Sequence, residues 1–460
     1  MATITNLGST SGLPLEEILT KLQAAEDKRL SIYSTRQASY EARVSAFGQV
    51  QSAVEALQKA AETLGKTTTL DAVKASVVGD GLSATVGTDG ATVGEYSINV
   101  KNLAAAQTLQ SGVVADRKTS HGASGSFEIE LANGDKRTIT LDDTSLNGIA
   151  KAINADDEAG VRATIITDGN GASYLMLSAR NTGEQAAVKS ITVTGTPELK
   201  DILNYNTDPA DTSAKLTQQT AAADAEIEIN GITVKSGSNN ISTTIDGITL
   251  NLTAKTEIGK SVTLKLTSDT AVASKAVQDF VTAYNALQST ITKLTAFDIT
   301  AETNQALTGD NTTRGIQSSM SNALQVFTGG DTVRSIADLG ISTDPKTGLL
   351  KLDQTKLDKA LTGNPADVKR LLTSTDGLAS KFAVATGNVL GDNGSIKASK
   401  DGLAKSIEDV KEQLARATSS STAQMDIMRA QFVALDKFVA QQTVTANYLT
   451  QQFAALAKST

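Results

Sequence analysis

A repeat of apolar side chains at the C-terminus constrains the fold of this chain more than any other feature. The repeat steps alternately by three and four residues over more than four heptads, through Met425, Met428, Phe432, Leu435, Val439, Gln442, Ala446, Leu449, Phe453 and Leu456. A period of 3.5 residues is typical of a coiled coil, in which one stripe of a helix packs against another helix. The sequence therefore predicts a long C-terminal helix that needs a partner.

The N-terminal part of the chain predicts a second long helix, over residues 14–65. Pro14 suits the first turn, and the acidic Glu16 and Glu17 suit the positive end of a helix dipole. An early apolar stripe is formed by Leu15, Ile18 and Leu22, and a second stripe runs from Tyr40 to Leu64. Gly65 is a natural C-terminal stop.

Between these ends the apolar period changes from about 3.6 to two. From Leu70 to about Thr267 the chain consists of β-branched runs that are broken by Gly, Asn and Asp. Hairpin turns are predicted at Asn133-Gly134, Asp168-Gly169 and Asn230-Gly231. A short amphipathic helix is predicted at 145–156, and the polar stretch 200–222 is interpreted as a connector.

Helical patterns return after the β-rich middle. They cover residues 271–297, 311–326, 353–361, 365–373 and 402–417. The predicted fold class is α+β multidomain, with a helical leg and coiled coil formed by both chain ends and β-rich head domains inserted between them. The predicted domains are terminal coiled-coil segments at 1–40 and 425–460, a helical leg at 41–70 and 271–424, a β-rich head at 71–112 and 221–270, and an outer head at 113–220.

Composition excludes most catalytic and binding chemistry. The chain has no Cys and a single His, so disulfides, thiolate nucleophiles and multi-His metal sites are not expected. The net charge of −8 comes from acidic and basic residues spread along the chain, which argues against a nucleic-acid partner or an anionic membrane. No apolar run is long enough for membrane insertion, and no cleavable secretory signal is recognisable. We expect no enzyme activity and no cofactor.

Short motifs that suggest chemistry have simpler explanations. Gly65-Lys66-Thr67 resembles the end of a phosphate-binding loop, but Ala60 stands where that loop needs its first Gly. Gly169-Asn170-Gly171 fits a tight turn, and the carboxylates at 142–143 and 156–158 fit solvated turns. His121 lies in a Gly/Ser-rich run and is interpreted as an exposed loop residue. No catalytic, metal or cofactor-binding residue is predicted.

The terminal stripes are candidates for an oligomer or filament interface. Ordering so long a segment costs more conformational entropy than one apolar stripe returns, so we expect the ends to need neighbouring copies along much of their length. Gln442 is either a tolerated polar residue or a device that fixes register. Gly65 and Ser420, the latter within the weakly helical run 418–422, are candidate hinges, and simple helix termination is the alternative for both.

One segment resembles the signature of bacterial flagellar filament cap proteins, the hook-associated protein type 2 family. The segment is GEYSINVKNLAAAQTLQSG at 94–112, and the matching positions are Gly94, Tyr96, Ile98, Val100, Leu103, Ala104 and Gln107. Segments 11–26, 277–295, 337–372 and 425–456 resemble further parts of the family, in the same order. The resemblance covers roughly residues 10–110 and 225–456.

The resemblance implies a structural role. Such a protein caps the distal end of the flagellar filament, retains exported flagellin and promotes its folding and insertion. The implied partners are other copies of the chain in a homo-oligomer, commonly a pentamer, together with flagellin, hook-associated junction proteins and a cytoplasmic export chaperone. The implied location is extracellular, after export by the flagellar type III apparatus without a cleaved signal peptide. Two alternatives stay open: another axial junction protein, and a cap that doubles as an adhesin for host glycans.

If the chain ends are ordered only by neighbours, amides at 430–455 should exchange rapidly with solvent in dilute, monomeric protein. Hydrogen exchange measured by mass spectrometry checks this, with the β-rich middle as the protected internal reference. Strong protection of 430–455 in the monomer would contradict the expectation.

Overall fold

The chain folds into two compact units, and one of them contains both chain ends. The structure is a computed structural model, and it describes residues 7–9, 11–88, 90–208, 212–298 and 303–457. One unit, here the helical unit, extends to Leu70 and resumes at Thr270. The other, here the β unit, comprises residues 71–269. The insertion of a β-rich segment between helical ends is as predicted, while the finer domain boundaries stay a prediction.

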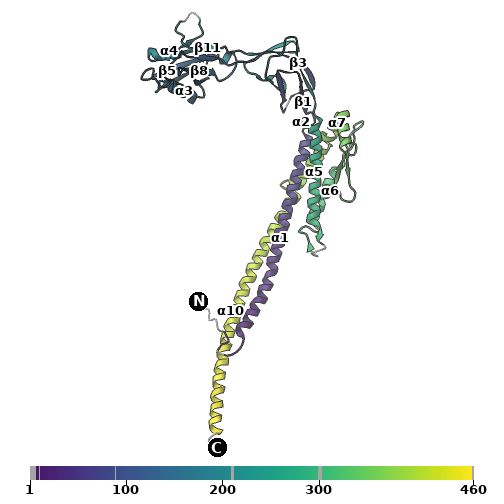
Figure 1. The fold of residues 1–460 in the computed structure, drawn as a ribbon. Coiled ribbons are helices and arrows are strands. Elements are labelled where there is room, and N and C mark those ends of the chain that lie inside the picture. The colour runs from purple at the N-terminus through teal and green to yellow at the C-terminus, as the bar shows by residue number, and fades with distance from the viewer. Residues whose placement is uncertain (1–6, 10, 89, 209–211, 299–302, 458–460) are drawn as a thin grey trace. The chain divides into compact units, whose positions relative to one another are not determined.

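The helical unit is built on two very long helices (Figure 1). These are α1 (Leu15–Gly65) and α10 (Ser395–Ala457). Around the second half of α1 lie α2 (Thr67–Leu70), α5 (Thr270–Thr295), α6 (Asn311–Ala323), α7 (Gln354–Gly363), α8 (Pro365–Thr373) and α9 (Leu378–Leu390). Two short hairpins complete the unit: β17 (Phe297–Asp298) with β18 (Thr303–Asn304), and β19 (Ile341–Thr343) with β20 (Leu350–Leu352).

Aromatic side chains lie at the centre of this bundle. The ring of Phe382 from α9 meets Phe280 edge-on at a centroid distance of 4.9 Å, and Tyr284 at 6.3 Å. All three are fully buried together with Phe47 of α1. Edge-to-face aromatic contacts add to the free energy of burial. The bundle core therefore holds one end of the α1–α10 pair in place.

Helices α1 and α10 run antiparallel. Lys400, near the start of α10, donates to the Gln51 amide oxygen at 3.2 Å, whereas Arg429, further along α10, lies 3.7 Å from Glu16 at the start of α1. Figure 1 shows the two helices side by side, with α10 continuing beyond the start of α1. Where the two helices leave the bundle, they pack against each other, and their outer faces are open to solvent.

Most helices lie where the sequence predicts them. The helix predicted at 14–65 is confirmed and ends at Gly65. The predictions for 271–297, 311–326, 353–361 and 365–373 are confirmed within three residues. Helix α9 was not predicted. The alternative of helix termination at 418–422 is wrong, because α10 passes through that run without a break, while the hinge itself stays a prediction. Tertiary packing against α1 outweighs the low helix propensity of Ser and Thr.

The β unit contains two apolar cores between antiparallel sheets. The first β core lies between a five-stranded sheet in the order β1-β16-β3-β12-β13 and a three-stranded sheet in the order β14-β15-β2. The strands are β1 (Val73–Val78), β16 (Val262–Ser268), β3 (Gly94–Asn102), β12 (Ala225–Ile229), β13 (Ile232–Ser236), β14 (Asn240–Ile245), β15 (Ile248–Leu252) and β2 (Leu82–Val86).

The second β core lies within residues 108–220. Its sheets have the orders β10-β9-β5-β6 and β11-β4-β8-β7. The elements are β4 (Thr108–Gln110), β5 (Gly125–Leu131), β6 (Lys136–Leu141), α3 (Leu146–Ala155), β7 (Val161–Thr167), β8 (Ser173–Ala179), β9 (Val188–Thr194), α4 (Pro197–Leu203), β10 (Tyr205–Asn206) and β11 (Thr217–Thr220). The three predicted turns each join antiparallel strands, and the predicted helix at 145–156 is confirmed as α3.

The interpretation of 200–222 as a connector is wrong. Helix α4 is capped by Thr196, whose hydroxyl accepts from the Leu199 amide, and its Ile202 and Leu203 are buried. Strand β11 is exposed on both faces and is held by backbone pairing to β4. A strand of this kind has no apolar alternation, so its sequence carries no period for a pattern to detect.

His121 is partly buried in the β unit, in contrast to the exposed loop residue expected. Its backbone amide donates to the Thr144 hydroxyl at 3.0 Å, while its Nε2 atom is shielded from water and has no hydrogen-bond partner among the described residues. Burial lowers the pKa of His121 below its ordinary value of 6.5, and the nearby Glu198 carboxylate opposes this only in part. Protonation of the imidazole is therefore disfavoured in the folded state.

This predicts an acid-sensitive β unit. The unfolded chain binds the His121 proton more tightly than the folded one, so the free energy of unfolding should fall as pH drops through about 6.5 towards the lower folded pKa. Calorimetry between about pH 7.5 and pH 5.5 should show a larger loss of thermal stability in the native protein than in His121→Leu. Parallel curves for the two proteins would contradict this assignment.

Candidate assembly interface

The predicted interface residues fall into three groups. The first group lies in the seam between α1 and α10: Leu15 and Met425 are buried, and Leu22, Met428, Phe432 and Val439 are half-buried. The second lies on outer faces of the same helices: Ile18 is 42% exposed, and Leu435 is also exposed. The third projects from α10 beyond the seam: Gln442, Ala446, Leu449 and Phe453. The side chain of Leu456 lies outside the described residues.

The seam shows that the two chain ends cover one another. We expected each stripe to need neighbouring copies along much of its length, and this is wrong for the first half of the C-terminal stripe, which α1 of the same chain covers. The N-terminal stripe also differs from the predicted one, because it uses Leu19 instead of Ile18. The observed repeat runs from Leu15 through Leu19 and Leu22 to Glu26. Because Glu26 is charged, this register appears less apolar in the sequence than the one through Ile18.

Polar contacts fasten the far end of the seam. Asp436 of α10 is only 8% exposed and accepts from the Ser11 amide at 3.0 Å and from the Ser11 hydroxyl. The chain before α1 is thereby tied to α10. Sequence reasoning missed this contact, since a lone acidic residue between the apolar positions of a repeat looks like an ordinary exposed side chain.

The last part of α10 carries apolar side chains that no described residue covers. Every described side chain from Gln441 to Ala457 is exposed, including Leu449 at 48% and Phe453 at 66%. Residues 438–457 contain no Asp, Glu, Lys or Arg. We call residues 438–457 the uncharged segment. Contiguous exposed apolar surface of this kind marks an interaction site.

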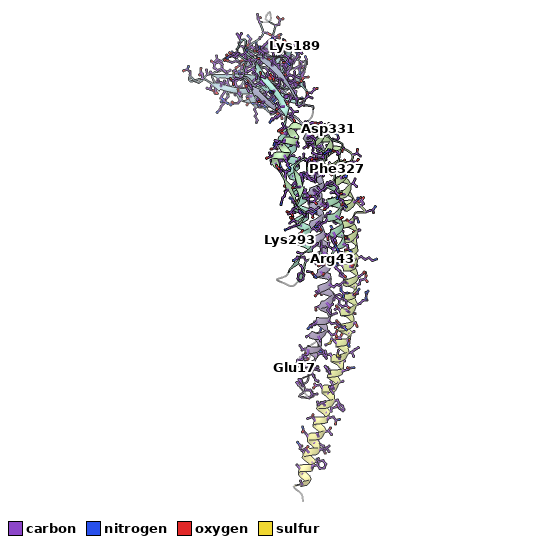
Figure 2. The ribbon with its side chains drawn as sticks, turned by 90° about the vertical axis from the view of Figure 1, so that its right-hand side faces the viewer. Glu17, Arg43, Lys189, Lys293, Phe327 and Asp331 are labelled. Carbon is purple, nitrogen blue, oxygen red and sulfur yellow. The ribbon has the colours of Figure 1, made fainter. Side chains whose placement is uncertain are left out.

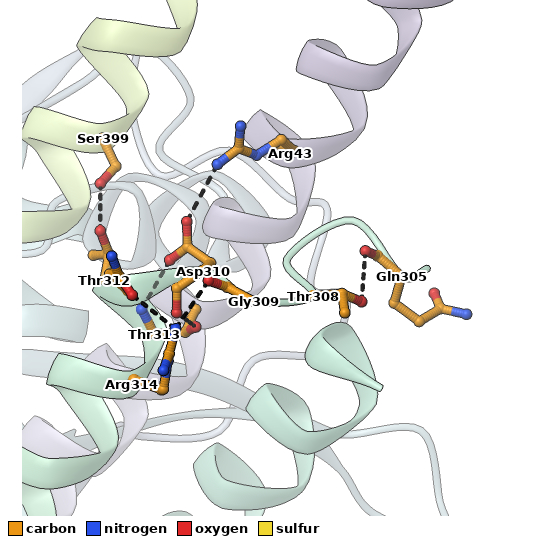
Figure 3. A network of polar contacts seen from close by, with 10 residues as sticks. Arg43, Gln305, Thr308, Gly309, Asp310, Thr312, Thr313, Arg314 and Ser399 are labelled. Atoms are coloured by element: carbon orange, nitrogen blue, oxygen red, sulfur yellow. Dashed lines mark hydrogen bonds and ion pairs between the residues drawn. The ribbon is translucent and has the colours of Figure 1, made fainter. Parts of the chain in front are cut away.

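The near end of α10 is fixed by contrast. Arg43 of α1 pairs with Asp310 at 3.2 Å, and the other Asp310 oxygen accepts from the Thr313 amide at the start of α6 (Figure 3). Thr312 of α6 lies 3.0 Å from the Ser399 hydroxyl of α10. This network joins α1, α6 and α10. The long pair is thus joined to the bundle at one end, and α10 alone continues beyond the other.

The two candidate hinges differ in their surroundings. Gly65 ends α1, and a Cβ there would lie 3.0 Å from the Ala379 Cβ of α9, so the glycine permits close helix packing. Ser420 lies exposed within unbroken helix, near a pocket of about 300 Å³ between the two helices that is lined by Leu19, Thr422 and Met425 among others. Bending at either position stays a prediction.

The signature segment forms the crossing from the first to the second β core. Ile98 and Val100 on β3 are fully buried, and Tyr96 packs at the edge of the same core. A Cβ on Gly94 would meet the Tyr96 ring at 3.6 Å. Leu103 is half-buried in the first β core. These residues build a fold and bring together no reactive groups.

Two amide side chains fix the crossing itself. The Asn239 side chain hydrogen-bonds to both backbone groups of Ala104. It accepts from the Ala104 amide at 2.7 Å and donates to the Ala104 carbonyl at 2.9 Å. Gln107 is buried, accepts from the Val188 amide at 2.7 Å and donates to Gln218 Oε1 at 2.8 Å and to the Tyr205 hydroxyl at 3.2 Å. Gln107 thereby links the two sheets of the second β core.

Clustered carboxylates serve ion pairs and helix ends. Asp156 lies 2.6 Å from the Arg137 Nε atom, and Glu158 lies 2.9 Å from Nη1 of the same guanidinium. The hydrogen bond from Arg137 is the main cause that lowers the pKa of Asp156. Within the described ranges, no three His, Asp or Glu side chains gather as a metal ion would require.

Comparisons with known proteins identify the family to which the chain is similar. Family models described as the N-terminus and the C-terminus of flagellar hook-associated protein 2 match residues 11–107 and 222–443. The chain is 35% identical to flagellar hook-associated protein 2 of Escherichia coli K12 over 469 residues, covering 98% of each. It is 32% identical to that of Salmonella typhimurium over 496 residues, covering all of both. The crystal structure of the D1-D2-D3 domains of the flagellar cap protein FliD from Escherichia coli matches with a TM-score of 0.67 and 33% identity, covering 78% of this chain and 99% of that one.

Replacing Gln107 tests whether the signature residues serve to stabilise the β unit. Gln107→Ala leaves the buried Val188 amide without its acceptor, and such a loss costs about 1–3 kcal/mol. The unfolding transition of the β unit should move accordingly in urea, with no change in the transition of the helical unit. Gln219→Ala, an exposed glutamine on β11, is the matched control. Equal stability of the two variants would show that the Gln107 contacts contribute nothing.

Proposed function

Because the chain belongs to the flagellar hook-associated protein 2 family, we propose that it caps the distal end of the flagellar filament, retains exported flagellin and promotes its folding and insertion as the filament grows. The full-length similarity to proteins of that name, and to a structure titled a flagellar cap protein, supports this function. The role is structural and needs no reacting group.

One observation carries the mechanism: the uncharged segment of α10 continues past α1 with its apolar side chains exposed. Single exposed apolar residues are normal, but a stripe through Leu449 and Phe453 at heptad spacing fits the side of another helix. Helical surfaces of neighbouring subunits at the filament end offer such a side. The anchored bundle then positions the segment and the free tip engages the filament.

The proposed partners follow from this arrangement. Other copies of the chain would surround the growing end as a homo-oligomer, for which the family resemblance suggests a pentamer. Flagellin and the hook-associated junction proteins would supply the helical surfaces that the uncharged segment contacts. Before export, a cytoplasmic chaperone would cover the same segment, since exposed apolar helix is prone to aggregate.

The proposed location is the outer tip of the flagellum, reached through the flagellar export apparatus. Among the helices that the structure describes, none carries a stretch that is both long and apolar enough to cross a lipid bilayer. Of the alternatives, another axial junction protein is not favoured, because the full-length relatives carry the hook-associated protein 2 name. Among the described residues of the β unit, no contact in hand favours a glycan adhesin over the cap.

The uncharged segment provides a direct test of the cap. Leu449→Ser combined with Phe453→Ser should abolish filament elongation in a cap-deficient strain, because it removes the apolar contact without disturbing any buried side chain. Filament length by electron microscopy and flagellin lost to the medium are the measurements. The isolated variant should keep its circular dichroism spectrum and melting temperature.

A matched control lies on the opposite side of the same turns. Asn447→Ser with Gln451→Ser changes two exposed polar residues and should leave elongation normal. If the Leu449/Phe453 variant supports filaments of ordinary length, the uncharged segment is not the surface that holds the cap in place.

A further inference from the structure

One aromatic side chain of the helical unit stands out from the core. Phe327 is 79% exposed, although its neighbours Val326 and Val333 are buried. Figure 2 shows Phe327 close to Asp331 and well away from Lys293 near the end of α5. Outside α10, no other described aromatic is as exposed. An exposed phenylalanine carries a free-energy cost that a contact would remove.

The loop that carries Phe327 is held in one conformation. Asp367 of α8 accepts from the Thr332 amide at 2.9 Å and from the Val333 amide at 3.3 Å. Arg370, one turn further on α8, donates to the Gly329 carbonyl at 3.0 Å. The Thr328 amide donates to the Arg334 carbonyl at 3.0 Å and closes the loop. The ring is therefore presented by a fixed support and would lose little entropy on binding.

The same unit contains an apolar pocket on different elements. A pocket of about 400 Å³ opens between α1, α2 and the first turns of α5. Its lining is made of small or methyl-bearing side chains with one charged pair: Thr63, Thr69, Ala271, Val272, Ala276, Lys275 and Asp279. Pockets with mostly apolar walls and few polar groups are suited to an aromatic ring.

We propose that Phe327 of one copy inserts into this pocket of the next copy, as a repeated contact between neighbouring helical units in the oligomer. The inference rests on the proposed cap function, which supplies the second copy. The Phe327 loop packs against α8, whereas the pocket is formed by α1, α2 and α5. The contact would therefore join two different surfaces of the helical unit. Heterologous contacts of this kind close into rings when the rotation allows.

Charge also favours a second copy as the occupant. Asp331 is exposed on the Phe327 loop, and Lys275 stands exposed at the pocket. Lys275 pairs with Asp279 one turn along the same helix, at 2.7 Å, and an exposed pair of this kind exchanges easily. Docking of the ring would bring Asp331 towards Lys275. Aromatic anchors in a fitted pocket, with charges at the rim, are typical of energetic centres in interfaces.

The absence of Cys from the chain allows a direct cross-linking test. Purified full-length Phe327→Cys and Ala271→Cys are mixed at concentrations that give oligomers and oxidised with copper phenanthroline. The expected product is a disulfide-linked dimer that forms only in the mixture, which excludes links within one chain. A mixture of Phe327→Cys with Lys293→Cys, at the other end of α5, should give none.

Association gives a second measurement that does not depend on oxidation. Phe327→Ala should weaken self-association at least tenfold in sedimentation velocity, with an unchanged melting temperature because the side chain is exposed. Thr332→Ala, exposed on the same loop, is the control and should associate normally.

The outcomes separate this inference from the cap function. No mixed disulfide, or unchanged association of Phe327→Ala, overturns the contact even when the native protein caps filaments. A disulfide from Phe327→Cys alone would also overturn it, since the loop would then face another copy of itself. A mixed disulfide, together with failure of the native protein to restore filaments in a cap-deficient strain, would support the contact and refute the cap.

Discussion

The antiparallel pairing of α1 with α10 is the constraint on which the rest of the structure depends. It joins residues at opposite ends of the chain, as the Ser11–Asp436 and Glu16–Arg429 contacts show. Because both ends belong to one unit, the β unit must be an insertion between α5 and the first two helices. The apolar seam buries Leu15, Leu19 and Met425, and the buried Asp436 carboxylate adds a contact to the chain before α1.

The contacts between α1 and α10 change along their length, so different parts of the pair have different surroundings. Close to the bundle, the Arg43–Asp310 pair holds α1 and the Thr312–Ser399 hydrogen bond holds α10. Further along, a pocket of about 300 Å³ opens between the two helices beside Leu19 and Thr422. Beyond the start of α1 the seam ends and the apolar stripe continues alone. One helix thus contributes first to the bundle core, then to the pair with α1, and finally presents exposed apolar side chains.

The sequence predicted the parts of the fold that have a strong period or a specific turn. The long end helices, α3 and the three hairpin turns follow from such patterns. It did not predict β11, which lacks apolar alternation, or the continuity of α10 through its Ser/Thr run, which tertiary contacts decide. It placed Ile18 in the seam instead of Leu19, because Glu26 disguised the register. The exposure of Phe327 and the pocket between α1, α2 and α5 could not be predicted, since each depends on how distant parts of the helical unit pack.

The insertion of the β unit also sets an order on folding. Residues 71–269 are contiguous in sequence and contain the strand partners of their own sheets. This unit can therefore fold as soon as that segment is free in solution. The helical unit cannot, because its first helix has to wait for residues some 400 positions away. A subunit released end-first would therefore complete its head while its leg is still unfolded, and would lock the leg only when the whole polypeptide has arrived at the site of assembly.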